Sequence, residues 1–308
     1  MRSTRAYIHL TNFRHNLEVI RNLCPTTRIC LAVKANAYGH GAARMARAAS
    51  EAGVHAFGVA TVDEGIELRD AGISEPVILY GLAGREELPL AISRDIELFC
   101  TDHEYLEAIT AAARLVGRQA RIHLKVDTGM GRIGCPPGLA RELARTIAAR
   151  GVAMAGICTH FPVSEESDQS YTRQQIQRFT ALVDEIRSDG IDPGLVHAAN
   201  SGGLGLFAEA RLDMVRPGIM AYGYAPGDEG FGHLDLRPVM ELRSTLSFIK
   251  EVAAGTPLSY GHRYRTDEAC RIGTLPVGYA DGLPRLASGK LRFLVMSGGE
   301  TLSFPQVG

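Results

Sequence analysis

The chain has 308 residues, 45% of them apolar, and a formal net charge of −1 at pH 7. This composition can fill a sizeable core and gives no basic field, which excludes wholesale disorder and argues against a nucleic-acid or membrane-surface partner. The six cysteines are scattered and lack metal-type spacing, which predicts a reduced cytoplasmic protein without a metal site or a disulfide framework. The sequence shows no signal-peptide pattern and no apolar window long enough to predict a membrane helix.

The chain begins with a short strand-like run at residues 5–10. From residue 29 to residue 223, β-like runs alternate with stretches that have helical periodicity or are rich in alanine. Glycines such as Gly117 and Gly190 stand where helix C-caps belong. The eight β-like runs lie at residues 29–34, 56–61, 76–81, 96–101, 121–127, 152–160, 195–200 and 214–223.

Eight strand–helix alternations predict an α/β fold, a (β/α)8 barrel of the TIM type. An open, doubly wound sheet is the alternative. Such a sheet would carry a G-x-G-x-x-G fingerprint after a strand, and none of the eight runs is followed by one. The sequence therefore favours the closed barrel.

After Tyr222 the alternation of strand-like and helix-like segments ends. A polar, glycine-rich linker covers residues 226–235, and the strand-like runs beyond it have no helices between them. These runs lie at residues 240–252, 269–279 and 290–298. The sequence therefore predicts a barrel at residues 11–228 and a smaller, mostly β C-terminal domain at residues 229–308, which the strand at 5–10 joins.

Polar residues collect where the predicted barrel strands end. Because the carboxyl ends of barrel strands and the loops that follow form the active site of this fold, we expect these residues to meet on one rim. Taken singly, each has an ordinary structural explanation, such as a strand-end lysine that reaches solvent or an asparagine that caps a helix. The candidates are Lys34, Lys125, Arg132, His160, Asn200, Ser201 and Arg216.

The chemistry of these residues fits one cofactor. The motif NSGG (200–203) opens a predicted helix with small residues, whose backbone N–H groups can meet a phosphate. Lys34 supplies an amine, His160 a flat ring and Arg216 a fixed cation. A phosphate, an aromatic ring and a carbonyl that condenses with lysine together describe pyridoxal 5′-phosphate (PLP), whose aldehyde forms a Schiff base with an enzyme lysine.

Seven motifs, in order along nearly the whole chain, resemble those of the alanine racemases, PLP enzymes with a barrel and a C-terminal β-domain. Any one of these short motifs is weak, but seven in register are specific. The motifs are AVKANAYGHG (32–41), KVDTGMGRIG (125–134), THF (159–161), HAANSG (197–202), MVRPGIMAYG (214–223), LSYG (258–261) and VGYADG (277–282).

The resemblance implies a role for each matching position. Lys34 would hold PLP as a Schiff base and act as one proton-transfer base, and Tyr260 would be the other base. Arg132 would meet the phenolic oxygen of the cofactor and the substrate carboxylate, and Tyr279 would stand at the substrate entrance. The residues that would hold the cofactor phosphate are Tyr38, Ser201, Gly218 and Ile219.

Four further positions follow from the same resemblance. His160 would face the cofactor ring, Asn200 would support the cofactor, and Arg216 would contact the pyridine nitrogen. Lys125 matches a lysine that is often carbamylated in the family. The chain ends at Gly308, before a cysteine–methionine–aspartate stretch that the family carries, so the resemblance predicts a β-domain that is incomplete here.

The implied activity is the interconversion of L-alanine and D-alanine by a two-base mechanism, which supplies D-alanine for peptidoglycan. The implied assembly is a homodimer in which Tyr260 acts in the neighbouring subunit's site. A racemase of serine or another amino acid would share the same residues. A PLP decarboxylase of the same barrel class should lack LSYG, and a non-catalytic PLP-binding protein would need the barrel alone.

Overall fold

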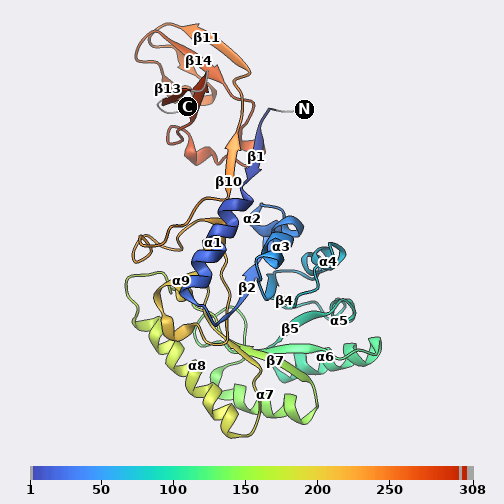
Figure 1. Cartoon of the computed structure of the whole chain (residues 1–308). Helices are drawn as coiled ribbons and strands as arrows, with labels where there is room; N and C mark the ends of the chain where they lie inside the picture. Colours follow the sequence, from blue (N-terminus) through green and yellow to red (C-terminus); the bar gives the residue numbers. More distant parts are fainter. Residues whose placement is uncertain (1–2, 298–299, 304–308) are drawn as a thin grey trace. The chain divides into compact units, whose positions relative to one another are not determined.

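The computed structural model describes residues 3–297 and 300–303. The chain forms two compact units (Figure 1). The first, called the barrel unit below, is Ile8–Val239. The second, called the β-unit, combines Met1–Tyr7 with Met240–Gly308. No helix in the described part of the chain is both long enough and apolar enough to cross a membrane.

Eight parallel strands close into a barrel in the barrel unit, in the order in which they occur along the chain. The last strand pairs with the first, with Arg28 opposite Met214, so no edge is left open. The (β/α)8 prediction is therefore confirmed, and the open sheet is wrong. The strands are β2 (Arg28–Ala32), β3 (Ala56–Val59), β4 (Val77–Leu79), β5 (Ile96–Cys100), β6 (Arg121–Lys125), β7 (Ala153–Cys158), β8 (Leu195–His197) and β9 (Met214–Val215).

Helices follow the strands, and Figure 1 shows α6, α7 and α8 packed outside the barrel. In α6, Leu106, Ile109 and Ala112 face inward at helical spacing and are buried. The Asp102 side chain caps this helix, and Gly117 ends it in the left-handed conformation. The helices are α1 (Leu10–Leu23), α2 (Lys34–Tyr38), α3 (Ala42–Glu51), α4 (Val62–Asp70), α5 (Leu88–Ser93), α6 (His103–Val116), α7 (Pro137–Ala149), α8 (Ser170–Ser188) and α9 (Ser201–Leu206).

The β-unit consists of short strand pairs, three of them antiparallel, which confirms the predicted small β-domain. The pairs are β1 (Arg5–Ile8) with β10 (Met240–Arg243), β11 (Phe248–Val252) with β14 (Cys270–Thr274), β12 (Pro257–Leu258) with β13 (Tyr264–Arg265), and β15 (Leu294–Ser297) with β16 (Glu300–Ser303).

The predicted strands of the β-unit are shorter in the structure than in the sequence analysis. The run at 240–252 is interrupted between β10 and β11, and the run at 269–279 ends at Thr274. Pro276 follows soon after and has no N–H to donate to a strand ladder. Residue 298, at the end of the predicted strand 290–298, and the C-terminal residues 304–308 lie outside the described residues.

Candidate active site

A cavity of about 420 Å³ opens at the carboxyl ends of the barrel strands. Its walls come from the last residues of the barrel strands and from the turns and loops that follow them. The ten predicted site residues of the barrel unit all line it: Lys34, Tyr38, Lys125, Arg132, His160, Asn200, Ser201, Arg216, Gly218 and Ile219.

A left-handed turn directly after β2 positions Lys34. Residues 35–38 all have φ values of 52° or 53°, which costs L-amino acids about 1–2 kcal/mol per residue. Glu64 on α4 helps to hold this turn, because its carboxylate accepts hydrogen bonds from the backbone N–H of Ala35 and of Ala60, each at 2.7 Å. The tight turn brings both of its ends, Lys34 and Tyr38, to the cavity wall.

One corner of the cavity is built from small groups on three loops. A Cβ at Gly218 would lie 2.8 Å from the Tyr38 hydroxyl, so glycine is needed for that approach. The Gly218 N–H donates to the Ser201 hydroxyl oxygen at 2.9 Å. Asn200 caps α9, its side-chain oxygen accepting from the Gly203 N–H at 2.9 Å. This corner therefore presents hydroxyl groups and glycine backbone to a ligand.

The loop after β6 carries Arg132 and is organised by Asp127. The Asp127 carboxylate accepts hydrogen bonds from the backbone N–H groups of Gly129, Met130 and Gly131 at 2.8–3.1 Å. Burial would raise the pKa of Asp127, but these N–H groups lower it below its ordinary value. The carboxylate thus stays ionised and fixes the loop that places Arg132 at the cavity.

Lys125 is a buried lysine whose amine loses its proton at a lower pH than that of an ordinary lysine. Burial lowers its pKa from 10.5 to about 8, and the positive charges of Arg216 and Arg132 add to that effect. Its amine donates a long hydrogen bond to the carbonyl of Val126, at 3.5 Å. Lys34 and Lys125 are two of only four lysines in the chain, and both line the cavity.

Arg216 lines the cavity and bonds to the segments that follow β7 and β8. Its guanidinium donates to the carbonyls of Thr159 at 2.6 Å and Ala198 at 2.9 Å, and one nitrogen is 3.3 Å from Nδ1 of His160. Burial, followed by the charge of Arg216, holds the pKa of His160 well below its ordinary value. His160 is therefore a neutral, flat ring at the cavity wall.

Tyr80, Phe99 and Glu165 are among the lining residues that the sequence did not predict. Tyr80 stacks on Phe99 with 6.1 Å between ring centroids, and its hydroxyl lies 3.1 Å from the Cys30 sulfur. Tyr80 follows β4 directly, so the strand-end rule that selected Lys34 could have found it. Glu165 stands in the long loop after β7, where no sequence signal marks it.

The charges that line the cavity favour an anionic ligand. Four cationic side chains line it, and Glu165 is the carboxylate among the lining residues that the structure describes. Such an excess of one charge in a concave, partly buried site raises the local concentration of the opposite charge. The cationic residues are Lys34, Lys125, Arg132 and Arg216.

Models of known families match both units. The model described as "Alanine racemase, N-terminal domain" matches residues 8–226, and "Alanine racemase, C-terminal domain" matches residues 239–308. The chain belongs to the alanine racemase family. The alanine racemase of Treponema denticola is 45% identical over 294 residues, covering 94% of this chain and 78% of that protein. The alanine racemase of Desulforamulus reducens is 42% identical, covering 94% and 80%.

Solved alanine racemases share the fold. The enzyme from D-cycloserine-producing Streptomyces lavendulae superimposes with a TM-score of 0.91 and 38% identity, over 99% of this chain and 81% of that one. The Bacillus anthracis alanine racemase with bound L-Ala-P gives a TM-score of 0.87 at 29% identity, over 99% and 79%.

Two residues of the alanine racemase motifs belong to the β-unit and are not among the residues that line the cavity. Tyr260 begins a short 3-10 turn and has 82% of its surface exposed. Tyr279 begins another such turn and is 67% exposed. The cavity itself is lined by barrel-unit residues alone.

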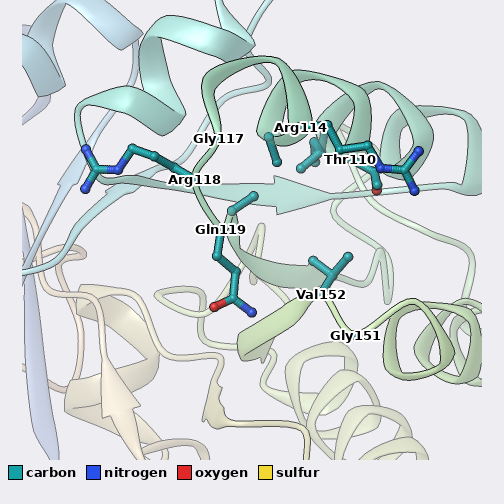
Figure 2. A pocket seen from close by; sticks show the side chains of 10 residues that line it. Thr110, Arg114, Gly117, Arg118, Gln119, Gly151 and Val152 are labelled. Atoms are coloured by element: carbon teal, nitrogen blue, oxygen red, sulfur yellow. The ribbon is translucent and has the colours of Figure 1, made fainter.

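A second hollow, of about 310 Å³, lies at the amino ends of β6 and β7 (Figure 2). It is lined by residues such as Thr110, Gln119 and Val152, and by none of the residues of the alanine racemase motifs. In this fold the amino-terminal face of the barrel serves stability, and the carboxyl-terminal face carries the site.

Proposed function

We propose that this chain is a PLP-dependent alanine racemase, an isomerase that interconverts L-alanine and D-alanine. The observation that carries the proposal is the cavity itself. Ten residues of the alanine racemase motifs, from five separate segments of the chain, line one pocket. The product D-alanine would serve peptidoglycan synthesis, and we place the reaction in the cytoplasm.

The residues of the cavity fit PLP. The cofactor is an anion with a flat ring and an aldehyde, and the cavity offers an excess of cations, a neutral flat ring at His160 and an amine at Lys34. Lys34 would hold the cofactor covalently, and Arg216 would meet its ring nitrogen. When bound, PLP supplies an electron sink for the charge left at the α-carbon after its proton is removed. The phosphate would be held by Tyr38, Ser201, Gly218 and Ile219.

Racemisation needs one proton removed from the α-carbon on one face and another delivered on the opposite face. Lys34 is anchored at the end of β2 and can act from the barrel side. Tyr260, on the exposed turn of the β-unit, is the base proposed for the other face. Arg132 would hold the substrate carboxylate so that the α-carbon lies between the two bases.

The β-unit supports a homodimer. Among its described residues, Thr266 is the one buried side chain. Apolar groups that a core would normally cover are open, including Phe248 at 59% and Leu294 at 77% exposed. Apolar area of this kind favours association with a second copy, as in obligate dimers. In the proposed dimer, Tyr260 of one subunit completes the cavity of the other.

Arg216 favours racemisation over transamination in this proposal. Arginine is a donor only, so the pyridine nitrogen beside it would stay unprotonated, which weakens the ring as an electron sink. We expect Arg216→Glu to raise the amount of pyridoxamine phosphate formed per racemisation event, because a carboxylate favours a protonated nitrogen. Product analysis by chromatography measures this ratio. An unchanged ratio in a folded, PLP-binding variant would contradict the role of Arg216.

Lys125 is the proposed carbamylation site. Its neutral amine would attack the carbon of CO₂ and form a nitrogen–carbon bond. The electron pair of one C=O π bond would move onto oxygen to give the carbamate anion, and the nitrogen would release one proton to water. The negative group formed would lie near Arg132, whose charge already acts on Lys125.

Carbamylation of Lys125 should depend on pH in a defined direction. Because its pKa is about 8, the reactive neutral form increases as the pH rises through about 8, well below the range of an ordinary lysine. With ¹³C-bicarbonate, we expect a carbamate signal in ¹³C NMR that is present at about pH 8 and lost in Lys125→Gln. A signal of equal size in the variant would place the carbamate elsewhere.

Chiral chromatography of the products tests the proposed function. Purified protein with PLP is incubated separately with L-alanine, L-serine and other L-amino acids. The proposal predicts D-alanine as the fastest product. Faster formation of D-serine would show that the protein is a serine racemase instead. If protein that holds PLP forms no D-amino acid, the result would favour a non-catalytic PLP-binding protein.

A further inference from the structure

A chain of buried polar side chains crosses the inside of the barrel. It runs from Glu97 on β5 through His123 on β6 and His197 on β8 to Arg216, directly after β9. All four residues are buried. The interior of such a barrel is normally filled by valine, isoleucine and leucine. A polar chain in that place costs desolvation free energy, so its presence calls for a role.

The distances along this chain define continuous hydrogen bonding. Glu97 Oε2 lies 2.8 Å from His123 Nε2, His123 Nδ1 lies 2.9 Å from His197 Nε2, and His197 Nδ1 lies 2.5 Å from Arg216 Nη1. Gly156 on β7 makes room for the chain, since a Cβ there would lie 2.5 Å from His123 Nδ1.

Arginine fixes where every proton in this chain lies. Arg216 can only donate, so Nδ1 of His197 must accept. The proton of His197 is then on Nε2 and is donated to Nδ1 of His123. The proton of His123 is in turn on its Nε2 and is donated to the Glu97 carboxylate. A second proton on either ring would set two N–H groups against each other, so both imidazoles are neutral.

Charges at the two ends of the chain agree with this order. Burial and then the charge of Arg216 hold the pKa of His197 well below its ordinary value. At the outer end, burial opposes ionisation of Glu97, but hydrogen bonds from His123 and Arg121 lower its pKa below the ordinary value. Arg121 Nε donates to Glu97 at 2.6 Å and is largely exposed, so the chain reaches the solvent there.

We propose that Glu97, His123 and His197 form a positioning relay that holds the Arg216 guanidinium in place and gives it a remote counter-charge. The relay takes one N–H of Nη1, and the carbonyls of Thr159 and Ala198 take those of Nη2. Within the described part of the chain, this leaves two of the five N–H groups for a ligand in the cavity that Arg216 lines. That these groups meet the PLP ring nitrogen rests on the proposed function.

NMR of the intact chain labelled with ¹⁵N-histidine tests the proton order directly, with and without PLP. We expect His123 and His197 to be neutral and protonated at Nε2. A proton on Nδ1 of His197, or a charged form of either ring, would overturn the relay. Failure of the wild type to bind PLP would contradict the proposed function and not the relay, because the proton order is measured without PLP as well.

A pair of variants tests the effect on the site. Glu97→Gln removes the counter-charge, and we expect altered imidazole N–H signals for His123 and His197 and a rise of about tenfold in the Kd for PLP, the size of one hydrogen bond to a charged group. Asp189→Asn is the matched control, because Asp189 is also a poorly exposed carboxylate paired with arginine, Arg141, on the outside of the barrel. It should change neither readout. Wild-type spectra and affinity in a folded Glu97→Gln protein would overturn the proposal.

Discussion

Lys34→Ala should abolish covalent attachment of PLP and lower the rate of racemisation by at least about 10³-fold, because it removes both the attachment point and one proton-transfer base. Borohydride reduction followed by peptide mapping measures the attachment. The map is simple because the chain has only four lysines, at 34, 125, 250 and 290.

Two variants control the Lys34 experiment. Lys250→Ala removes a lysine of the β-unit and should leave both attachment and activity unchanged. Lys34→Arg keeps the positive charge of the cavity but cannot form the covalent link, so it should resemble Lys34→Ala. PLP that remains covalently bound to Lys34→Ala would contradict the assignment.

Mixing Lys34→Ala and Tyr260→Ala subunits should restore activity that neither variant has alone. If Tyr260 acts in the partner's cavity, one site of each mixed dimer lacks both bases and the other has both. Random pairing makes about half of the dimers mixed, and one of the two sites in each is complete, so about a quarter of wild-type activity should return. The measurement is D-alanine formation after co-refolding.

The alternative predicts a different result for the same mixture. If Tyr260 serves its own subunit, every site in every dimer lacks one base, and no activity returns. Sedimentation of the mixture shows whether mixed dimers have formed. Mixed dimers without activity would contradict the shared site, while a chain that stays monomeric would contradict the proposed dimer.

The barrel could be predicted because its signals are local. Each strand is a short apolar run bounded by helix-like sequence, and glycine ends helices such as α6 at Gly117. Even β9, with two residues, was inside a predicted run, 214–223. The strands of the β-unit were less well predicted, because its strand pairs expose apolar and polar groups alike and lack a clear inward face.

The site could be predicted in part for a related reason. Strand ends meet at one rim of a barrel, so residues such as Lys34 and His160 could be brought together from the sequence alone. The left-handed turn at 35–38 could not, because alanine gives no signal for positive φ, and Glu64 stabilises it from another helix. The relay from Glu97 could not be predicted from the sequence either, because its hydrogen bonds join residues on separate strands that share no motif.

Incubation of the protein and PLP with L-alanine in D₂O tests the central claim most directly. If two separate bases act, the proton delivered to the α-carbon comes from a group that has exchanged with solvent, so the D-alanine formed should carry deuterium at Cα. Chiral separation followed by mass spectrometry reads both the configuration and the label. The account predicts deuterated D-alanine. D-alanine that keeps its original α-proton, or no D-alanine at all from PLP-loaded protein, would contradict it.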